Sequence, residues 1–233
     1  MKRATSATPA VAPGAGPGIA PVIVFARAPV PGEVKTRLIA RLGARGAAAL
    51  HAALVERTLE TACSARVSRV ELCCAPDESH PFFLACAQRF GVALTAQAEG
   101  DLGARMHAAF ERVVPGSGRA LLIGTDCPAL TSAHLRDAAA ALQAGHDAVL
   151  GPAEDGGYVL IGLARTSPRV FDGIGWGGPD VLRDTRARLG ALGWRWHELA
   201  ELWDVDRPDD LARLAERIDS GARYVEAALN AGL

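Results

Sequence analysis

An acidic side chain follows a short apolar run in the middle of the chain. The run spans residues 120–123, it breaks at Gly124, and Asp126 follows shortly afterwards, before Pro128. This pattern predicts a buried strand with a carboxylate just beyond its carboxyl end. Ligands of open α/β sheets bind at that edge, where a carboxylate could hold a divalent cation and, through it, a phosphate. The alternative is that Asp126 only caps a loop.

Basic side chains gather around a loop near the start of the chain. Residues 22–26 form a continuous, largely β-branched run, which is typical of a central parallel strand covered on both faces. The loop region that follows carries five candidate nucleotide-binding residues, which are Arg27, Pro31, Gly32, Lys35 and Arg37. Such a loop at the start of a helix indicates a phosphate cradle, and solvated surface charge is the alternative. It is not a nucleotide-binding P-loop, because Val34 rather than glycine precedes Lys35.

Two further aspartates lie near the carboxyl end of the chain. Asp204 and Asp206 flank Val205, so an extended backbone places both carboxylates on one side. The acidic residues 209–210 follow a proline and are explained as first-turn residues of one last long helix. Asp204 and Asp206 have no such explanation and are therefore candidates for binding a ligand.

Glycine-rich stretches lie between the two acidic segments. Residues 154–157 read Glu-Asp-Gly-Gly and precede an apolar run at 158–163, which predicts a tight turn into an antiparallel strand. Residues 171–179 are also rich in glycine and surround Trp176. Such a loop could be a mobile lid over a ligand or a long surface connection.

These segments belong to an alternating series of strands and helices that begins at residue 21. Apolar runs predict strands at 22–26, 69–75, 91–97, 120–123, 148–152, 158–163 and 194–198. Amphipathic patterns predict helices at 46–64, 81–90, 102–113, 131–144 and 179–189. This alternation predicts an α/β fold with a mostly parallel sheet, in which one strand is antiparallel. We expect a single domain over residues 21–233.

The composition is ordinary for a globular protein of 233 residues, with 49% hydrophobic and 22% charged residues. A net charge of −1 offers no general basic surface, so we expect no nucleic-acid partner. Five cysteines without a C-x-x-C pair indicate the reducing cytoplasm. Residues 1–20, rich in Ala, Pro and Gly, are expected to be a disordered leader. No later segment approaches the roughly 18 apolar residues that span a membrane, so no membrane partner is expected.

Five sequence blocks occur in a fixed order and together resemble a known bacterial family. They read PVIVFARAPVPGEVKTRL, GDLGARM, LLIGTDCPAL, GPAEDGGYVLIGL and WDVDRPDDL. The family is that of the selenium- or arsenosugar-associated transferases, within the GT-A or nucleotide-diphospho-sugar transferase superfamily. It is similar to phospholactate guanylyltransferase and to the molybdopterin nucleotidyltransferases. The resemblance covers about residues 21–218, and the ordered blocks are far more specific than any single one.

The resemblance implies a GT-A-like, Rossmann-like three-layer α/β/α sandwich with a mixed, mostly parallel central sheet. Lys35 and Arg37 would hold the nucleotide phosphates. The base or ribose side of the nucleotide would contact Gln97, Gly100, Asp101 and Arg105. Asp126 would bind Mg²⁺ or Mn²⁺, and Asp206, or else Asp204, would complete the metal site. The acceptor would contact Asp155, Gly156, Gly157, Tyr158 and Trp176.

Two positions depart from the family pattern. The segment that follows residues 120–123 has one aspartate, Asp126, rather than the D-x-D of many glycosyltransferases, so two adjacent aspartates do not share a metal there. Relatives carry Ser or Thr after the lid tryptophan, whereas Gly177 and Gly178 stand here. A hydroxyl contact to a phosphate is therefore lost, or backbone N–H groups make it.

The chemistry that these residues suit is transfer with a phosphate leaving group. A divalent cation on Asp126, with Lys35, would stabilise the negative charge that develops on the leaving oxygens. The first hypothesis is a metal-dependent glycosyltransferase that moves a sugar from a nucleotide-activated donor to a small-molecule acceptor. Asp155 would orient or deprotonate the acceptor, unless it only caps its turn. The alternatives are a nucleotidyltransferase that releases pyrophosphate from a nucleoside triphosphate, and a non-catalytic nucleotide-binding protein.

Overall fold

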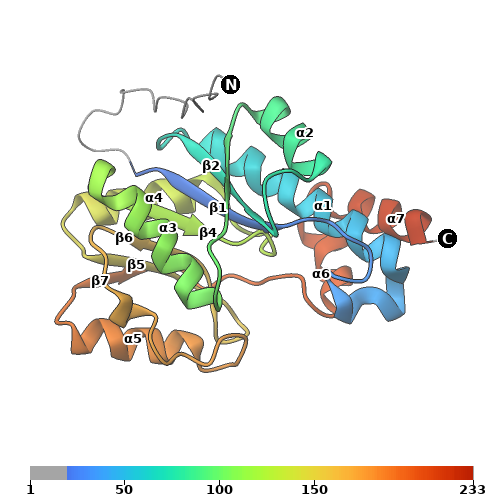
Figure 1. Ribbon diagram of the computed structural model, residues 1–233. Helices are drawn as coiled ribbons and strands as arrows, with labels where there is room; N and C mark the ends of the chain where they lie inside the picture. Colours follow the sequence, from blue (N-terminus) through green and yellow to red (C-terminus); the bar gives the residue numbers. More distant parts are fainter. Residues whose placement is uncertain (1–19, 233) are drawn as a thin grey trace, which may run out of the picture.

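One sheet of seven strands organises the protein, which we describe from a computed structural model over residues 20–232 (Figure 1). The strands are β1 (Val22–Arg27), β2 (Val70–Ala75), β3 (Ala93–Ala96), β4 (Ala120–Ile123), β5 (Ala148–Pro152), β6 (Tyr158–Leu163) and β7 (Trp196–Glu198). Their order is β3-β2-β1-β4-β6-β5-β7, and β6 runs antiparallel to β4 and β5 while the other pairs are parallel. The predicted mixed, mostly parallel sheet is confirmed. The leader predicted for residues 1–20 lies, apart from Ala20, outside the described residues.

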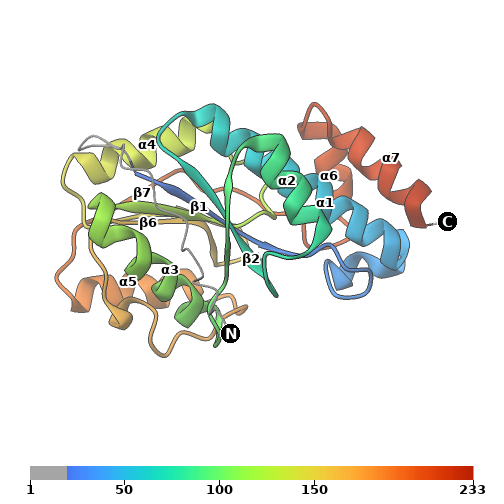
Figure 2. The same ribbon diagram turned by 45° about the horizontal axis from the view of Figure 1, so that its top comes forward.

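Helices cover both faces of the sheet. They are α1 (Ile39–Ala65), α2 (Pro81–Phe90), α3 (Leu102–Ser117), α4 (Ser132–Gln143), α5 (Val181–Ala191), α6 (Asp210–Arg217) and α7 (Gly221–Gly232). Figures 1 and 2 show α1, α2 and α4 on one face and α3 and α5 on the other. Alternate side chains of β1 enter opposite cores, because Val24 lies in one apolar cluster with Leu59, and Ile23 in another with Phe110. The predicted three-layer sandwich is confirmed.

The parallel pairing of β1 with β4 brings two distant loops side by side. Val24 lies opposite Ile123 in the register, so both strands end at the same edge of the sheet. Arg27 closes β1, and Asp126 follows β4 after a short turn. Gln97, just beyond β3, joins the same edge, and its N–H donates to the carbonyl of Cys74 at 2.8 Å. The fold therefore places the basic loop beside the candidate metal ligand.

The carboxyl-terminal region differs from the single long helix that was predicted there. α6 ends at Arg217, Ile218 has an extended backbone, and α7 begins after a turn. A Cβ at Gly221 would lie 1.8 Å from the carbonyl oxygen of Leu214, so glycine permits this close approach of the two helices. Both helices pack with the first part of α1 in a third apolar cluster around Val205.

The helix α1 is longer and more apolar than the sequence analysis predicted. It begins at Ile39 rather than near residue 46, and it bends at Gly43, where φ is +70°. The segment Thr36–Ala65 is long and apolar enough to cross a membrane by length and composition, with a mean hydropathy of 1.3 in its best window. The expectation that no segment approaches this limit was therefore wrong. Half of that window is buried inside the protein, as in a core helix.

The close contact between α1 and α7 leads to a prediction on stability. A Cβ at Gly46 would lie 2.3 Å from the carbonyl oxygen of Ala228. Gly46→Ala should therefore displace α7 and lower the free energy of unfolding by about 1–3 kcal/mol. Gly190→Ala in α5 is the control, because the described residues leave the space around its new Cβ open. Equal urea midpoints for the two variants would contradict this account of the packing.

Candidate functional site

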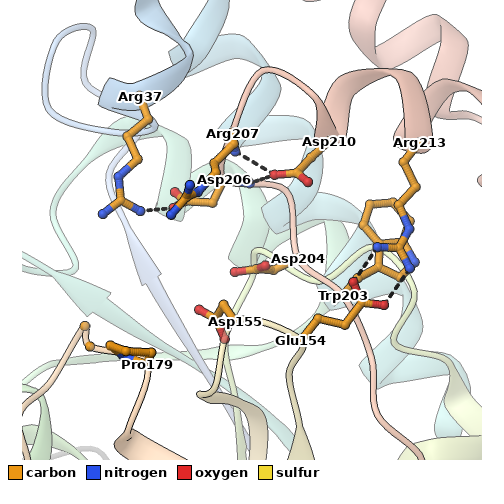
Figure 3. Close-up of a pocket in the computed structure, with 12 residues that line it drawn as sticks. Arg37, Glu154, Asp155, Pro179, Trp203, Asp204, Asp206, Arg207, Asp210 and Arg213 are labelled. Atoms are coloured by element: carbon orange, nitrogen blue, oxygen red, sulfur yellow. Dashed lines mark hydrogen bonds and ion pairs between the residues drawn. The ribbon is translucent and has the colours of Figure 1, made fainter.

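Three adjoining cavities form one cleft along the carboxyl edge of the sheet, and Arg37 and Asp206 line all three. The loop cavity, of about 690 Å³, lies between the basic loop and the segment before α3. The tryptophan cavity, of about 350 Å³, lies beside Trp176. The acidic cavity, of about 390 Å³, contains Asp155 and Asp204 and is drawn in Figure 3.

Most residues predicted to bind the nucleotide line the loop cavity. They are Arg27, Lys35, Arg37, Gln97, Gly100, Asp101 and Arg105. Pro31 and Gly32 do not line it, because both are exposed and Gly32, with φ of +90°, shapes the turn of the loop, so their contact with a nucleotide remains a prediction. Asp101 caps the N-terminus of α3, and Arg105 Nε donates to the carbonyl of Gly100 at 2.8 Å. The segment before α3 is thereby held in one shape.

Lys35 is bound to the wall of the cleft. Its backbone is left-handed, with φ of +47°, and only 4% of its side chain is exposed. Its Nζ lies 2.7 Å from Asp126 Oδ1 and donates to the carbonyl oxygen of Val205 at 2.5 Å. Because an ammonium group has three donors, one remains available. Lys35 lines the predicted phosphate site, but its charge is already paired with Asp126.

The carboxylate of Asp126 faces the cleft, with 51% of its side chain exposed. Desolvation favours the neutral carboxyl, but the charge of Lys35, and to a smaller extent that of His51, outweighs it and lowers the pKa of Asp126 below its usual value. Asp126 is therefore ionised at neutral pH. Within the described residues its ionic contacts all go to Oδ1, so Oδ2 is available to a ligand.

His51 of α1 lies behind the pair of Lys35 and Asp126, and the sequence analysis did not single it out. Its Nε2 donates to the carbonyl oxygen of Arg27 at 3.0 Å, and its Nδ1 lies 4.0 Å from Asp126 Oδ1. Burial lowers the pKa of His51, although Asp126 opposes this, so the ring is neutral at pH 7. A histidine next to Leu50, within the buried stripe of an apolar helix, was the signal that could have identified it.

The segment that carries Asp204 and Asp206 runs along the cleft. Val205 between them is fully buried, and its N–H donates to the carbonyl of Asp126 at 2.8 Å. Both aspartates line the tryptophan and acidic cavities. Asp206 forms an ion pair with Arg37 (Figure 3), so the carboxylate that was expected to complete a metal site is already neutralised.

Asp204 has no ion-pair partner among the described residues. Figure 3 shows its carboxylate and that of Asp155 in the same cavity. Desolvation, then the negative charge of Asp155, and more weakly those of Asp126 and Asp206, raise the pKa of Asp204 to about 6. Mutual repulsion among these carboxylates is what a bound cation would relieve.

The residues predicted to contact the acceptor lie around the tryptophan cavity. Those that line it are Asp155, Gly157, Tyr158 and Trp176. Gly156 lies behind the cavity, since its φ is +88° and a Cβ there would lie 2.0 Å from the carbonyl oxygen of Pro179. Gly156 shapes the turn, and its contact with an acceptor remains a prediction. Asp155 Oδ1 accepts a hydrogen bond from Gly157 N–H at 2.9 Å, so Asp155 also caps this turn.

Residues 176–178 form part of the wall of the tryptophan cavity. Trp176 packs against Gly103 of α3, where a Cβ would lie 2.7 Å from the indole ring. The indole N–H of Trp176 is buried and has no hydrogen-bond partner within residues 20–232. Gly177, with φ of +82°, and Gly178 both line the cavity with backbone alone. Trp176 is therefore seated on α3, and Gly177 and Gly178 can offer a phosphate only main-chain groups.

An ion pair that no motif indicated lies at the far end of the acidic cavity. Arg213 of α6 donates to both oxygens of Glu154 at 2.6 and 2.7 Å, and its guanidinium lies 4.5 Å from the ring centre of Trp203 (Figure 3). The pair joins α6 to the turn before β6. Sequence patterns did not predict it because the partners are 59 residues apart.

Within residues 20–232, no three His, Cys, Asp or Glu side chains converge closely enough to hold a metal ion alone. Mg²⁺ needs only one or two carboxylates where substrate phosphates supply further oxygens. The five cysteines are all unpaired. Burial raises the pKa of Cys127 to about 12, so this thiol beside Asp126 is not a nucleophile at neutral pH.

Comparison with known proteins identifies a family whose model matches the chain and solved structures with a similar fold. The model of the family described as "Uncharacterized protein conserved in bacteria (DUF2064)" matches residues 58–178. The crystal structure of a candidate nucleotide-diphospho-sugar transferase from Desulfovibrio desulfuricans G20 is similar over 91% of this chain and 97% of that one. Its TM-score is 0.79 and its sequence identity is 29%. No curated protein sequence matches the chain.

Two more distant structures share the fold. A cytidylyltransferase from Leptospira borgpetersenii serovar Hardjo-bovis has a TM-score of 0.56 and 12% identity, covering 91% of this chain and 94% of its own. Rv0371c from Mycobacterium tuberculosis H37Rv has a TM-score of 0.55 and 20% identity, covering 86% of this chain and 100% of its own. The predicted GT-A-like architecture is thus confirmed.

Proposed function

We propose that this protein, which belongs to the DUF2064 family of bacterial proteins, is a transferase that moves a sugar from a nucleotide-diphospho-sugar to a small-molecule acceptor. The observation that carries the proposal is the juxtaposition, at one edge of the sheet, of the ionised Asp126 and the basic loop. Ligands of such sheets bind at this edge. The likeness to the Desulfovibrio structure supports the same class of reaction.

The charge of the loop cavity favours a diphosphate donor over a triphosphate. Its cationic side chains are Arg27, Lys35, Arg37 and Arg105, and its anionic ones are Glu33, Asp101, Asp126 and Asp206. These charges balance, because the neighbouring His51 is neutral. One divalent cation would then complement the diphosphate bridge of a nucleotide sugar, whereas a triphosphate would leave an excess of negative charge.

The residues present fit Mg²⁺ or Mn²⁺ held between protein and phosphate. Asp126 offers its free Oδ2. Desolvation first, and then the negative charge of Asp155, raise the pKa of Asp204, and a bound cation would stabilise its ionised form. We therefore assign Asp204 rather than Asp206 as the second ligand, since Arg37 neutralises Asp206. The cation would supply Lewis-acid stabilisation of the leaving phosphate oxygens.

The other residues of the cleft would bind and orient the two substrates. Gln97 donates its side-chain amide to the carbonyls of Ala26 and Cys73 at 3.3 and 3.0 Å, which leaves its oxygen to accept from the base or ribose. Arg27 and Arg105 would contact the diphosphate. Asp155 would orient the acceptor hydroxyl and take its proton, since the acidic and tryptophan cavities meet at this carboxylate.

A product assay tests the proposal directly. The purified protein is incubated with Mg²⁺, a set of small-molecule acceptors that carry hydroxyl groups, and a panel of nucleotide sugars and nucleoside triphosphates. The released phosphate species are identified by ³¹P NMR. Release of a nucleoside diphosphate is the expected result. Release of pyrophosphate from a triphosphate would instead identify a nucleotidyltransferase. Nucleotide binding without any product would identify a non-catalytic binding protein.

The assignment of the second metal ligand gives a separate prediction. Asp204→Asn should weaken Mn²⁺ binding by roughly tenfold or more, because a free carboxylate is lost from the site. Asp206→Asn should weaken it by less than about threefold, because Arg37 already neutralises that carboxylate. Mn²⁺ titration followed by electron paramagnetic resonance measures both affinities. The reverse order would restore Asp206 as the ligand.

Several finer expectations remain predictions. They are the relation to the selenium- or arsenosugar-associated transferases and to phospholactate guanylyltransferase, the cytoplasmic location, and the lack of nucleic-acid and membrane partners. Identifying the acceptor in the product assay would test the first of these.

A further inference from the structure

The ring of His51, beside the loop cavity, carries a buried hydrogen-bond acceptor that has no partner among the described residues. Its Nε2 faces the carbonyl oxygen of Arg27 at 3.0 Å, and since a carbonyl only accepts, this nitrogen carries the proton. The neutral ring then has its lone pair on Nδ1. That atom is buried and has no hydrogen-bond partner among the described residues, although the side chain lines the loop cavity.

A group close to this lone pair is another acceptor. Asp126 Oδ1 lies 4.0 Å from Nδ1, which is too far for a hydrogen bond but is a spacing that one donor can bridge. Lys35 Nζ lies 2.7 Å from that same oxygen. Two of its donors go to Asp126 and Val205, which leaves a third for another acceptor.

A cation on Asp126 would compete with the ammonium of Lys35. Both are positive, so binding of the cation weakens the contact between Lys35 and Asp126. The whole residue Lys35 is 9% exposed, so its ammonium is buried. A buried ammonium that loses one acceptor without gaining another is destabilised. An alternative acceptor beside Lys35 therefore makes it easier for the ammonium to give up its contact with Asp126.

We propose that His51 is a positioning residue whose Nδ1 is the alternative acceptor onto which the Lys35 ammonium moves when a divalent cation takes Asp126. The hydrogen bond from Lys35 to the carbonyl of Val205 stays in place and acts as the pivot. The hydrogen bond from Nε2 to Arg27 keeps the lone pair of Nδ1 directed at the site. This inference rests on the proposed function, because it requires a cation at Asp126.

Two amide substitutions test the roles of the two ring nitrogens of His51 one at a time. In His51→Asn the amide oxygen can occupy the position of Nδ1, while the donor to Arg27 is lost. In His51→Gln the amide N–H can replace Nε2 and reach the carbonyl of Arg27, while the acceptor at Nδ1 is lost. Melting temperatures of both variants establish that they are folded before binding is compared.

The probe is MgCl₂, added alone and with inorganic pyrophosphate, and binding is measured by calorimetry. His51→Gln should weaken Mg²⁺ binding by about tenfold, the size expected for one hydrogen bond, and His51→Asn by less than about threefold. In the wild-type protein, ¹⁵N NMR of the histidine ring should show the Nδ1 signal moving upfield as Mg²⁺ is added. Asp126→Asn should abolish that movement.

The outcomes separate this inference from the proposed function. If Mg²⁺ binds through Asp126 but the Nδ1 signal does not move and both variants bind like the wild type, the role of His51 is wrong while the cation site stands. If His51→Asn is the weaker binder, His51 acts through Arg27 and the inference is overturned. If the wild type binds no Mg²⁺ under either condition, the proposed cation site fails and this inference fails with it.

Discussion

Replacing Asp126 by asparagine is expected to lower kcat/KM for the nucleotide-sugar substrate by at least about a hundredfold, the effect typical of losing one preorganised electrostatic contact. The substitution keeps the size of the side chain but removes the charge that would hold a cation between protein and phosphate. Steady-state rates measured at several Mg²⁺ concentrations test this. A partial recovery at high Mg²⁺ is expected, because part of the loss is in cation affinity.

The control for this variant is Asp137→Asn, an exposed position on α4 that lies outside the three cavities. It should leave kcat/KM unchanged. Near-ultraviolet circular dichroism confirms that both variants keep their packing. A loss of less than about threefold for Asp126→Asn, with the fold intact, would mean that Asp126 is only a structural partner of Lys35.

Lys35→Met is expected to impair both stability and donor binding. The methionine keeps the apolar stem but removes the ammonium that contacts Asp126 and the carbonyl of Val205. We expect the free energy of unfolding to fall by about 2 kcal/mol, less than for a fully buried ion pair, because Asp126 is half exposed and can be hydrated. Urea unfolding measures this loss, and the affinity for a nucleotide diphosphate should fall at least about tenfold.

The pH dependence of the stability that Lys35→Met loses identifies the cause of that loss. The folded pKa of Asp126 lies below its unfolded value, so the stabilising pair is fully present above the unfolded pKa of about 4 and is lost as the pH falls through the folded pKa. The difference between wild type and Lys35→Met should therefore shrink as the pH falls below about 4. The exposed pair of Arg37 and Asp206 gives the control, since Arg37→Met should cost less than about 1 kcal/mol. A difference that persists unchanged in acid would rule out the ion pair as its source.

The positions of the main site residues could be predicted because they depend on local patterns and one topological rule. Continuous apolar runs marked β1 and β4, and residues that follow parallel strands lie at one edge of the sheet. The placement of Arg27, Gln97 and Asp126 around one cavity follows from that rule. The alternation around Val205 predicted only that the two carboxylates lie on one side of the segment; both line the tryptophan cavity, and Val205 between them is buried.

The partners of these residues could not be predicted, because they depend on contacts between distant segments. Lys35 meets the carbonyl of Val205 across 170 positions, and Arg37 meets Asp206 across 169. Such pairs are formed by packing of α1 against the segment before α6, for which the sequence carries no periodic signal. The break between α6 and α7 was missed for a related reason, since only the close approach at Gly221 requires it.

The central claim is that Asp126 binds a nucleotide through a divalent cation. The most direct measurement is a thermal-shift panel of nucleoside mono-, di- and triphosphates and nucleotide sugars, each with and without Mg²⁺ or Mn²⁺, on wild type and Asp126→Asn. A ligand at a hundredfold excess over its Kd stabilises by about 2.7 kcal/mol, or roughly 5–10 °C for a chain of this size. We predict such a shift for a nucleotide sugar only with the cation, and its loss in Asp126→Asn. A shift that is independent of the cation, or equal in both proteins, would contradict the claim.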